Sequence, residues 1–334
     1  MKKHIVVKYR ILVLTIEVII FLLFVFLAYN YVSVPAKKTT FYLSDSKSST
    51  LLKTLSKHGY NIYTLDKYVL KFMKTPKKGW YSLKNKRQGR FTFFKSLHTR
   101  QTKTMNIKLY AGETSEELTK RLANDMKLDP IRLLNAYKSH SQYKESDLFS
   151  GRYTVARNAD ENTTIAYLSE CSNKIFRHFS HTYTHKKHSE LEKKVLLIIA
   201  SIIQKESNSI DEMPLISSVI YNRLEKGMKL QMDGTLNYGK FAHIIVTPER
   251  IKNDNSLYNT YKHKGLPPAP LGTVSIEALR AAYSPKASEY LFFMLNKDGS
   301  HNFASTYENH IKNIRAFKSK SKDDTYTKKI KPSL

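Results

Sequence analysis

The stretch "LEKKVLLIIASIIQKESN" (Leu191–Asn208) decides how the second half of the chain is interpreted. Three isoleucines and Glu206 stand at positions i, i+3, i+4 and i+7, so the pattern predicts a helix with Glu206 on its apolar face and Lys205 pointing away. Desolvation and the negative end of the helix dipole would both raise the pKa of such a carboxyl group. A glutamic acid that stays protonated near neutral pH is what general-acid cleavage of a glycosidic bond requires. Periodicity alone still favours a simpler interpretation, in which Glu206 is the solvent-exposed end of a buried helix.

The segments after this helix supply polar groups of the kind that a carbohydrate groove needs. "DEMPLISSVIYNRLEKGMKL" predicts a second helix that ends at Gly227, "SIEALRAAYSP" a short helix and "YLFFMLN" a buried strand. Between them lie two loops rich in polar and aromatic residues, "LQMDGTLNYG" and "YNTYKHKGLPPAPLG". Long polar loops on an apolar helical base are typical of ligand grooves. The candidate substrate-binding residues are Asn222, Gln231, Asp233, Thr235, Tyr238, Asn259, Tyr261 and His301.

The N-terminus predicts a membrane anchor. Ile11–Val34 is apolar with Glu17 as its one charge, and its 24 residues, at about 1.5 Å each in a helix, are long enough to cross a bilayer. The stretch is longer than the apolar region of a cleaved signal peptide. Because four basic residues precede it, we expect residues 1–10 in the cytoplasm and everything after about Pro35 outside the inner membrane.

The charge balance limits the partners. The 334 residues include 56 Lys and Arg against 28 Asp and Glu, a net charge of +28, which predicts attraction to nucleic acid, a lipid surface or an acidic polymer. The lysines are spread along the whole chain, and the anchor disfavours nucleic acid, so we expect no nucleic-acid partner. The single cysteine, Cys171, excludes an internal disulfide and a cysteine-based zinc site. We expect no metal and no cofactor.

Two segments before the helix have the same predicted order of elements. The first is Phe41–Met73 followed by Gly79–Leu83, and the second is Ile107–Tyr137 followed by Gly151–Val155. Each predicts a strand, two helices and a closing strand, and "TSEEL" in the second copy predicts a helix capping box. The second copy resembles a LysM module, a fold that binds the N-acetylglucosamine of cell-wall glycans. A plain spacer is the alternative interpretation.

One histidine cluster invites a metal-site interpretation. "HFSHTYTHKKHS" places His178, His181, His185 and His188 at spacings of three, four and three, which on a helix puts them on one face. Thr182–Thr184 are poor helix formers, and the segment lies where a linker is expected before the apolar helix. We therefore expect a solvated basic linker.

Four motifs occur in a fixed order, "IASIIQKES", "VIYNRLEKGMKLQMDGTLNYG", "YNTYKHKGLPPAPLG" and "GSHNFASTYENH". Together they resemble the endolytic murein transglycosylases, the YceG-like family, over roughly Leu191–Phe317. This resemblance implies a membrane-anchored lytic transglycosylase that cuts within nascent peptidoglycan strands, with Glu206 in the position of the catalytic acid. Its implied partners are peptidoglycan glycan strands and the membrane, and peptidoglycan synthases are further candidates.

The chain departs from the family pattern at three places. Gln204 stands where family members commonly have another glutamate, which leaves Glu206 as the only acid at this end of the helix. Gly234 stands where proline is usual. "LFSGRYTV" (Leu148–Val155) replaces a segment that resembles Leu-Phe-Pro-Asp-Thr-Tyr. The loop geometry at the last two places is therefore less well predicted.

The sequence thus predicts an α+β chain with one transmembrane helix. The expected segments are a cytoplasmic N-terminus (1–10), the transmembrane helix (11–34), a first β-α-α-β unit (35–103), a LysM-like unit (104–156), a YceG-like catalytic domain (157–317) and a mobile basic tail (318–334). The expected reaction cleaves the β-1,4 bond between N-acetylmuramic acid and N-acetylglucosamine to a 1,6-anhydro end, which would terminate strand elongation. Two alternatives stay open: a water-using muramidase with Asp233 as partner carboxylate, and a non-catalytic wall-binding scaffold.

Overall fold

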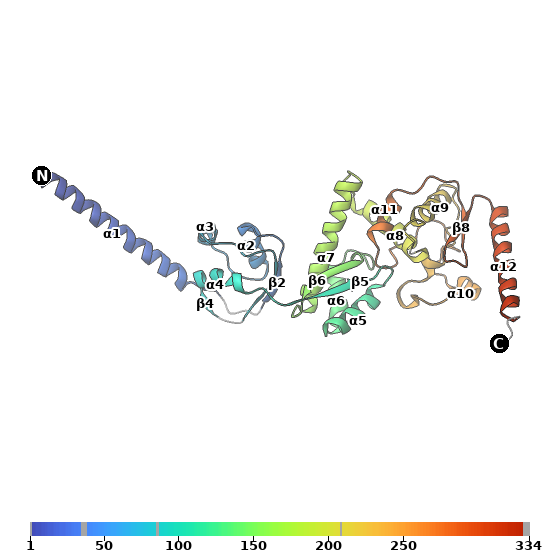
Figure 1. Cartoon of the computed structure of the whole chain (residues 1–334), viewed down its shortest axis with the longest axis horizontal. Helices are drawn as coiled ribbons and strands as arrows, with labels where there is room; N and C mark the ends of the chain where they lie inside the picture. Colours follow the sequence, from blue (N-terminus) through green and yellow to red (C-terminus); the bar gives the residue numbers. More distant parts are fainter. Residues whose placement is uncertain (1, 35–38, 85–86, 208, 330–334) are drawn as a thin grey trace. The chain divides into compact units, whose positions relative to one another are not determined.

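The computed structural model describes the chain except for residues 1, 35–38, 85–86, 208 and 330–334 (Figure 1). The chain divides into two compact units. Unit 1 comprises Met1–Asn106 and Thr154–Thr163, and unit 2 comprises Ile107–Tyr153 and Thr164–Leu334. Most of the predicted LysM-like segment therefore belongs to the same unit as Glu206.

The first helix is long and apolar. α1 runs from Lys2 to Tyr31, and an 18-residue window within its stretch Val6–Tyr31 has a mean hydropathy of 3.1 and is not buried by the rest of the chain. Such a helix fits a membrane span and also fits a signal sequence. It ends three residues before the predicted end of the span because Ser33–Val34 form a short strand, β1, which pairs antiparallel with β4 (Gln88–Gly89).

Unit 1 contains the first predicted repeat. β2 (Thr39–Leu43) pairs antiparallel with β3 (Gly79–Leu83), and α2 (Ser48–Lys57) and α3 (Thr64–Phe72) lie between them in sequence. Alternate residues of β2 are buried, as expected of a strand with one face on a core. Two further elements, α4 (Arg90–Ser96) and the 3₁₀ turn η1 (Leu97–Thr99), complete this core with phenylalanine and leucine side chains.

A buried ionic cluster joins α1, α3 and α4. The Asp66 carboxylate accepts hydrogen bonds from Arg90 Nε at 2.5 Å, from Arg90 Nη2 at 2.6 Å and from the Tyr29 hydroxyl at 2.7 Å. Removing one partner of a buried ion pair costs about 3–5 kcal/mol, because the other charge stays buried without compensation. The last turn of α1 is therefore part of the fold of unit 1.

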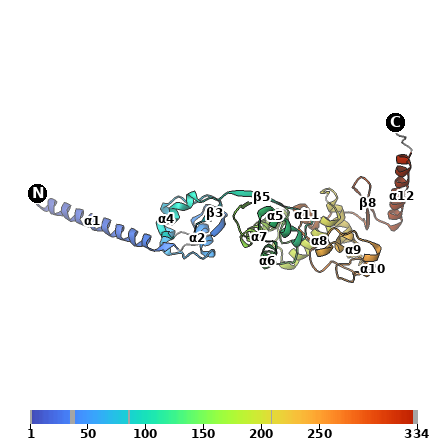
Figure 2. The ribbon, with the colours of Figure 1, turned by 90° about the horizontal axis from the view of Figure 1, so that it is seen from below.

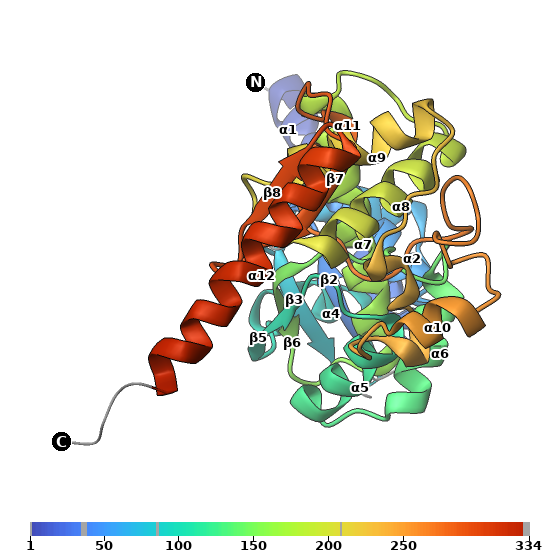
Figure 3. The same cartoon turned by 90° about the vertical axis from the view of Figure 1, so that its right-hand side faces the viewer.

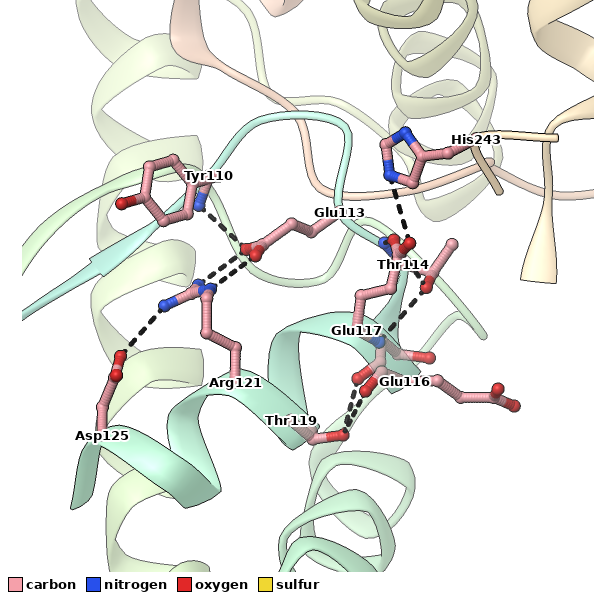
Figure 4. Close-up of polar contacts among 10 residues, drawn as sticks. Tyr110, Glu113, Thr114, Glu116, Glu117, Thr119, Arg121, Asp125 and His243 are labelled. Atoms are coloured by element: carbon pink, nitrogen blue, oxygen red, sulfur yellow. Dashed lines mark hydrogen bonds and ion pairs between the residues drawn. The ribbon is translucent and has the colours of Figure 1, made fainter. Parts of the chain in front are cut away.

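The second predicted repeat has the same order of elements. It consists of β5 (Thr104–Leu109), α5 (Ser115–Met126), α6 (Pro130–His140) and β6 (Gly151–Ala156), and β5 pairs with β6. The predicted capping box at the start of α5 is confirmed: Thr114 Oγ1 accepts from the backbone N–H of Glu117 at 3.3 Å, and the Glu117 carboxylate accepts from the backbone N–H of Thr114 at 2.9 Å (Figure 4).

The core of unit 2 is helical. α7 (Glu161–His178) precedes α8 (Glu190–Glu206), α9 (Met213–Glu225) and α11 (Ile276–Tyr283), and the last three pack on one another (Figures 1 and 2). α8 is buried from Leu196 to Gln204, as its apolar sequence predicts. Around these helices lie η3 (Asp233–Leu236), η4 (Gly239–Phe241), α10 (Pro248–Asn253) and the antiparallel hairpin of β7 (Phe292–Leu295) and β8 (His301–Ala304).

The histidine-rich segment differs from the solvated linker that we expected. α7 continues to His178, and a π-helical turn, η2 (Phe179–Tyr183), follows it. Phe179 is buried and its ring stacks on the rings of Tyr183 and His188. The burial of this one ring holds the segment against the helical core. Within the described part of the chain, no three His, Cys, Asp or Glu side chains are grouped so that they could hold a metal ion.

Two further expectations need correction. β7 is half-buried to exposed, not buried, because within the described residues it pairs with β8 alone. The tail predicted at 318–334 is helical as far as Lys329: it continues α12, which runs from Tyr307 to Lys329 and whose first turns, before the tail, lie beside the β7–β8 hairpin (Figure 3).

Candidate active site

Glu206 is the last residue of α8 and lies in the wall of a cavity of about 260 Å³. The isoleucines predicted to share its helix face, Ile199, Ile202 and Ile203, are buried, as is the whole of α8 from Leu196 to Gln204. Glu206 itself is half-buried and keeps a surface toward the cavity. The cavity is lined by Lys205, Glu206, Ser207, Ser209, Leu295, Gly299 and His301.

The surroundings of Glu206 favour its protonated form. Burial raises the pKa of this carboxyl group from 4.5 to about 7, and the negative charge of Asp233 adds to the rise. A hydrogen bond from the backbone N–H of Gly234 and the positive charge of Arg223 oppose it. Glu206 is therefore partly protonated near neutral pH, and among the described residues it has one hydrogen-bond partner.

That partner is the backbone of Gly234 in η3. The Gly234 N–H donates to Glu206 Oε1 at 2.8 Å. A Cβ atom at this position would lie 2.6 Å from the Cβ of Lys205 and 2.8 Å from Glu206 Oε1, so the close approach leaves no room for a side chain. Glycine is required here by packing. Proline, the residue noted above as usual at this place in the family, could not donate this hydrogen bond.

Next to Glu206 lies a tyrosine–aspartate pair. The Tyr261 hydroxyl donates to Asp233 Oδ1 at 2.6 Å. Burial, together with this hydrogen bond and the charge of Asp233, raises the pKa of the Tyr261 hydroxyl, and the charge of Glu206 contributes in the same direction. These electrostatic couplings place both predicted residues close to the candidate acid. Asp233 is exposed, so its carboxylate is accessible to a ligand.

His301 is the second predicted residue in the cavity wall, and it has a partner that the sequence did not indicate. Its backbone N–H donates to Glu212 Oε1 at 2.7 Å, and its Nδ1 lies 2.7 Å from Glu212 Oε2. Both side chains are largely buried. Glu212 precedes α9 and is 89 residues away from His301 in sequence. The acidic start of the α9 motif was visible, but no local pattern could connect it with a histidine in β8.

Three of the predicted substrate-binding side chains hold loops in place. The Asn259 amide is fully buried and donates to the backbone carbonyls of Ile251 and Asp254 at 2.8 and 2.7 Å. The Asn222 amide donates to the carbonyls of Ser288 and Tyr290 at 2.8 and 2.9 Å. These side chains, and the buried Thr235, whose hydroxyl donates to the carbonyl of Met232, are not in the wall of the Glu206 cavity.

The remaining two predicted residues lie on the polar loops. Gln231 is exposed and adopts a left-handed backbone conformation with a φ of 50°. Tyr238 is half-buried and stacks on Tyr258 with ring centroids 4.0 Å apart. Neither lines the cavity at Glu206.

The turn before α5 packs against the end of α8. Thr273 makes two backbone hydrogen bonds of 2.7 Å with this turn: its carbonyl accepts from the Gly112 N–H, and its N–H donates to the Glu113 carbonyl. Lys205 Nζ donates to the Gly112 carbonyl at 2.7 Å, and Lys205 also lines the Glu206 cavity. The predicted LysM-like segment is thus fixed to the residue next to the candidate acid.

A second contact between these regions involves His243. Its Nε2 lies 3.1 Å from Glu117 Oε1, in the capping box of α5 (Figure 4). Nearby, the buried Glu145 accepts hydrogen bonds from the backbone N–H and the hydroxyl of Ser115 at 2.6 and 3.0 Å. Burial raises the pKa of Glu145 to about 7, and the bonds from Ser115 oppose that rise. No sequence pattern indicated Glu145.

Comparison with known proteins identifies the family. The model of the YceG-like family matches residues 43–316. The chain belongs to the YceG-like family. The match extends the resemblance seen in Leu191–Phe317 through the second β-α-α-β repeat and most of the first.

Individual relatives agree with this assignment. The chain is 30% identical over 184 residues to a protein of Streptococcus pneumoniae serotype 2 named endolytic murein transglycosylase. The aligned residues cover 53% of this chain and 33% of that protein. A Bacillus subtilis protein of the same name is 31% identical over 154 residues, 46% of this chain and 43% of that protein. The matches thus span less than half the length of these relatives.

A solved structure has the same fold. The crystal structure of the putative yceG-like protein lmo1499 from Listeria monocytogenes matches with a TM-score of 0.53 and 25% sequence identity. The match covers 83% of this chain and 99% of that one. The mixed helix and strand architecture, with its predicted YceG-like type, is therefore confirmed.

Proposed function

We propose that this protein is a membrane-anchored lytic transglycosylase that cleaves within peptidoglycan glycan strands. The observation that carries the proposal is Glu206, a carboxyl group with a pKa of about 7 in the wall of a cavity. It occupies this position in a chain of the YceG-like family whose relatives are named endolytic murein transglycosylases. A general acid needs a pKa near the working pH, and Glu206 meets that requirement.

Glu206 acts first as acid and then as base. It donates its proton to the oxygen that bridges N-acetylmuramic acid and N-acetylglucosamine, and the bond from that oxygen to the muramic C1 breaks. The positive charge that develops at C1 is shared with the ring oxygen or with the N-acetyl group of the substrate. The C6 hydroxyl of the same sugar then attacks C1 and gives its proton to the Glu206 carboxylate. This step closes the 1,6-anhydro ring and restores the acid, so no second carboxylate is needed to activate a water molecule.

The hydrogen bond from Gly234 orients this acid. Because Glu206 Oε1 accepts the Gly234 N–H, the proton of the neutral acid belongs on Oε2. The same bond stabilises the carboxylate that forms after proton donation. The charge of Asp233 acts on Glu206, Tyr261 donates to Asp233, and His301 lines the same cavity as Glu206, so we propose that these three residues position sugar hydroxyl and N-acetyl groups.

The anchor is supported by the way α1 is built into unit 1. Tyr29 donates to the buried Asp66, and the ring of Phe26 packs edge-on against Phe91 with centroids 5.1 Å apart. A signal peptide is removed after export, whereas these contacts are made by the last turns of α1. We therefore propose that α1 is retained as a transmembrane helix, with the basic N-terminus in the cytoplasm and both β-α-α-β repeats and the catalytic region outside the inner membrane.

One observation favours a second function. Asp233 is exposed and close enough to Glu206 for its charge to act on it, so it could hold a water molecule as the general base of a muramidase. The two reactions give different ends: an anhydro end without water, and a reducing end with water. A wall-binding scaffold would produce neither.

The test is digestion of intact peptidoglycan by the purified full-length protein, with the released muropeptides analysed by mass spectrometry. We expect anhydromuropeptides with the wild type and none with Glu206→Gln. Glu225→Gln is the matched control, because Glu225 is exposed on α9. Reducing ends would support the muramidase, and an absence of any new ends with the wild type would refute an enzymatic role.

A further inference from the structure

Helix α3 of unit 1 has an apolar stripe that faces away from the protein. The side chains of Leu65, Tyr68 and Phe72 are 50%, 53% and 92% exposed. Their spacing of three and four residues places them along one side of the helix. The opposite side is already buried in the core of unit 1 through Asp66 and Leu70. α3 thus has two apolar sides, and the core of unit 1 covers only one of them.

The surroundings of this stripe are strongly basic. Between Ile62 and Tyr81 the only acidic residue is Asp66, which is buried and paired with Arg90. The same stretch carries five lysines, all of them exposed: Lys67, Lys71, Lys74, Lys77 and Lys78. An apolar stripe flanked by lysines is typical of helices that lie in the interface of an anionic lipid membrane.

The position of α3 along α1 decides between a lipid surface and other partners. Asp66 on α3 accepts the hydroxyl of Tyr29 on α1 at 2.7 Å. Tyr29 lies two residues before the end of the apolar stretch Val6–Tyr31, about 3 Å along the helix axis. The Asp66 side chain therefore connects α3 to the last turn of α1, where the apolar span ends. A bilayer crossed by α1 has its headgroup region at this level.

We propose that the exposed stripe of α3 inserts into the outer interface of the membrane that α1 crosses. This inference rests on the proposed retention of α1 as a transmembrane helix. Phe72 and Leu65 enter the boundary between headgroups and acyl chains, and Tyr68 lies at headgroup level, as tyrosines at membrane interfaces do. The lysines extend their charged ends to anionic headgroups while their aliphatic stems cover the edge of the stripe. Unit 1 is then held flat on the membrane by two contacts, the α1 span and the α3 stripe.

The test places a fluorescent label at single sites of the full-length protein in phospholipid vesicles. In a Cys171→Ser background, Phe72→Cys is labelled with an environment-sensitive dye and quenched by nitroxide-bearing lipids. Ile131→Cys on α6 is the matched control, because Ile131 is an apolar residue that is 70% exposed on a helix of unit 2. Phe21→Cys, 65% exposed in the middle of α1, reports whether the helix spans the bilayer.

We expect the label at residue 72 to be quenched by nitroxides near the headgroups, at a depth of about 5–10 Å, and the label at residue 131 to show no quenching above background. Quenching at residue 72 should be stronger in vesicles that contain phosphatidylglycerol than in phosphatidylcholine alone, because the lysines bind anionic headgroups. Equal signals at residues 72 and 131, with residue 21 quenched, would overturn the inference and leave the anchor intact. A partner protein on the stripe would give that result. If residue 21 is not quenched, the anchor and the inference both fail.

Discussion

Replacing Glu206 by Gln separates a catalytic acid from a merely structural carboxyl group, because the two interpretations predict opposite changes in activity and stability. Glutamine keeps the shape of the side chain and an oxygen that can accept the Gly234 N–H. It removes the proton that the reaction needs. If the Glu206 carboxylate stabilises the fold, its replacement lowers the free energy of unfolding. If burial disfavours the charged carboxylate, its replacement does not lower that free energy.

The magnitude follows from the raised pKa. The pKa of Glu206 is about 7 in the folded protein against an ordinary 4.5, which corresponds to about 3 kcal/mol. Because the folded pKa is the higher one, the folded state binds the proton more tightly, and the stability that this binding provides is complete below pH 4.5 and is lost as the pH rises to 7. Above pH 7 the wild type therefore holds a buried carboxylate at a cost that the glutamine variant does not bear.

The assay is thermal unfolding of both proteins at pH 5 and at pH 8, together with peptidoglycan digestion. At pH 8 the variant should be more stable by up to about 3 kcal/mol, or about 6–12 °C for a unit of this size, and the difference should shrink toward pH 5. Wild-type activity should fall about tenfold per pH unit above pH 7, as the acid loses its proton. Glu225→Gln should change neither property, since that side chain is exposed.

Two results would refute this reasoning. A variant with full transglycosylase activity would remove Glu206 from the reaction. A stability difference that is the same at pH 5 and pH 8 would show that the carboxyl group has an ordinary pKa, and the general-acid proposal would then lack its physical basis.

Three other substitutions test the surroundings of the site. Gly234→Ala should lower activity at least about tenfold, because its methyl group would lie 2.8 Å from the Glu206 carboxylate, and retained activity in the same digestion assay would contradict the packing requirement. Glu212→Gln should weaken substrate binding by releasing His301 while the pH profile stays unchanged; a shifted profile would instead place Glu212 in the proton transfer. Glu145→Gln should lessen the loss of stability between pH 5 and pH 8, measured by urea unfolding, because the folded pKa of about 7 lies above the ordinary 4.5; an unchanged pH dependence would mean that Glu145 titrates normally.

Local patterns predicted much of the fold. The two strand–helix–helix–strand repeats and the capping box at Thr114 depend on residues a few positions apart, and each was confirmed. α4 was not predicted, because its phenylalanines are ordered by a core that the β2–β3 pair and α2 supply. The π-helical turn at Phe179 was mistaken for a linker for a similar reason: its polar composition is that of a loop, and one buried aromatic ring outweighs it.

The candidate site was predictable only in part. The period of α8 predicted that Glu206 shares a helix face with three isoleucines, but it could not predict the amide of Gly234, which lies 28 residues later in the sequence. Composition indicated loops that contact sugars. It could not distinguish a side chain that faces a ligand from one that donates hydrogen bonds to the backbone carbonyls of its own loop. Asn259 is of the second kind, because the carbonyls of a tightly folded loop need buried donors.

Gln204, which stands where family members commonly have a glutamate, leaves Glu206 as the one acid at the end of α8. Residues two apart on a helix point to different sides, so Gln204 and Glu206 cannot share one environment. Gln204 Oε1 accepts from the backbone N–H and the hydroxyl of Ser275 at 3.3 and 2.7 Å, at the start of α11. Accepting the hydrogen bonds of Ser275 requires an oxygen but no charge. The Gln204 amide supplies that oxygen at a buried position, without the free-energy cost of desolvating a second carboxylate. Residue 204 thus packs against α11, and the proposed proton transfer belongs to residue 206. Because Gln204 carries no charge, it adds nothing to the raised pKa of Glu206, which is set by burial and by Asp233.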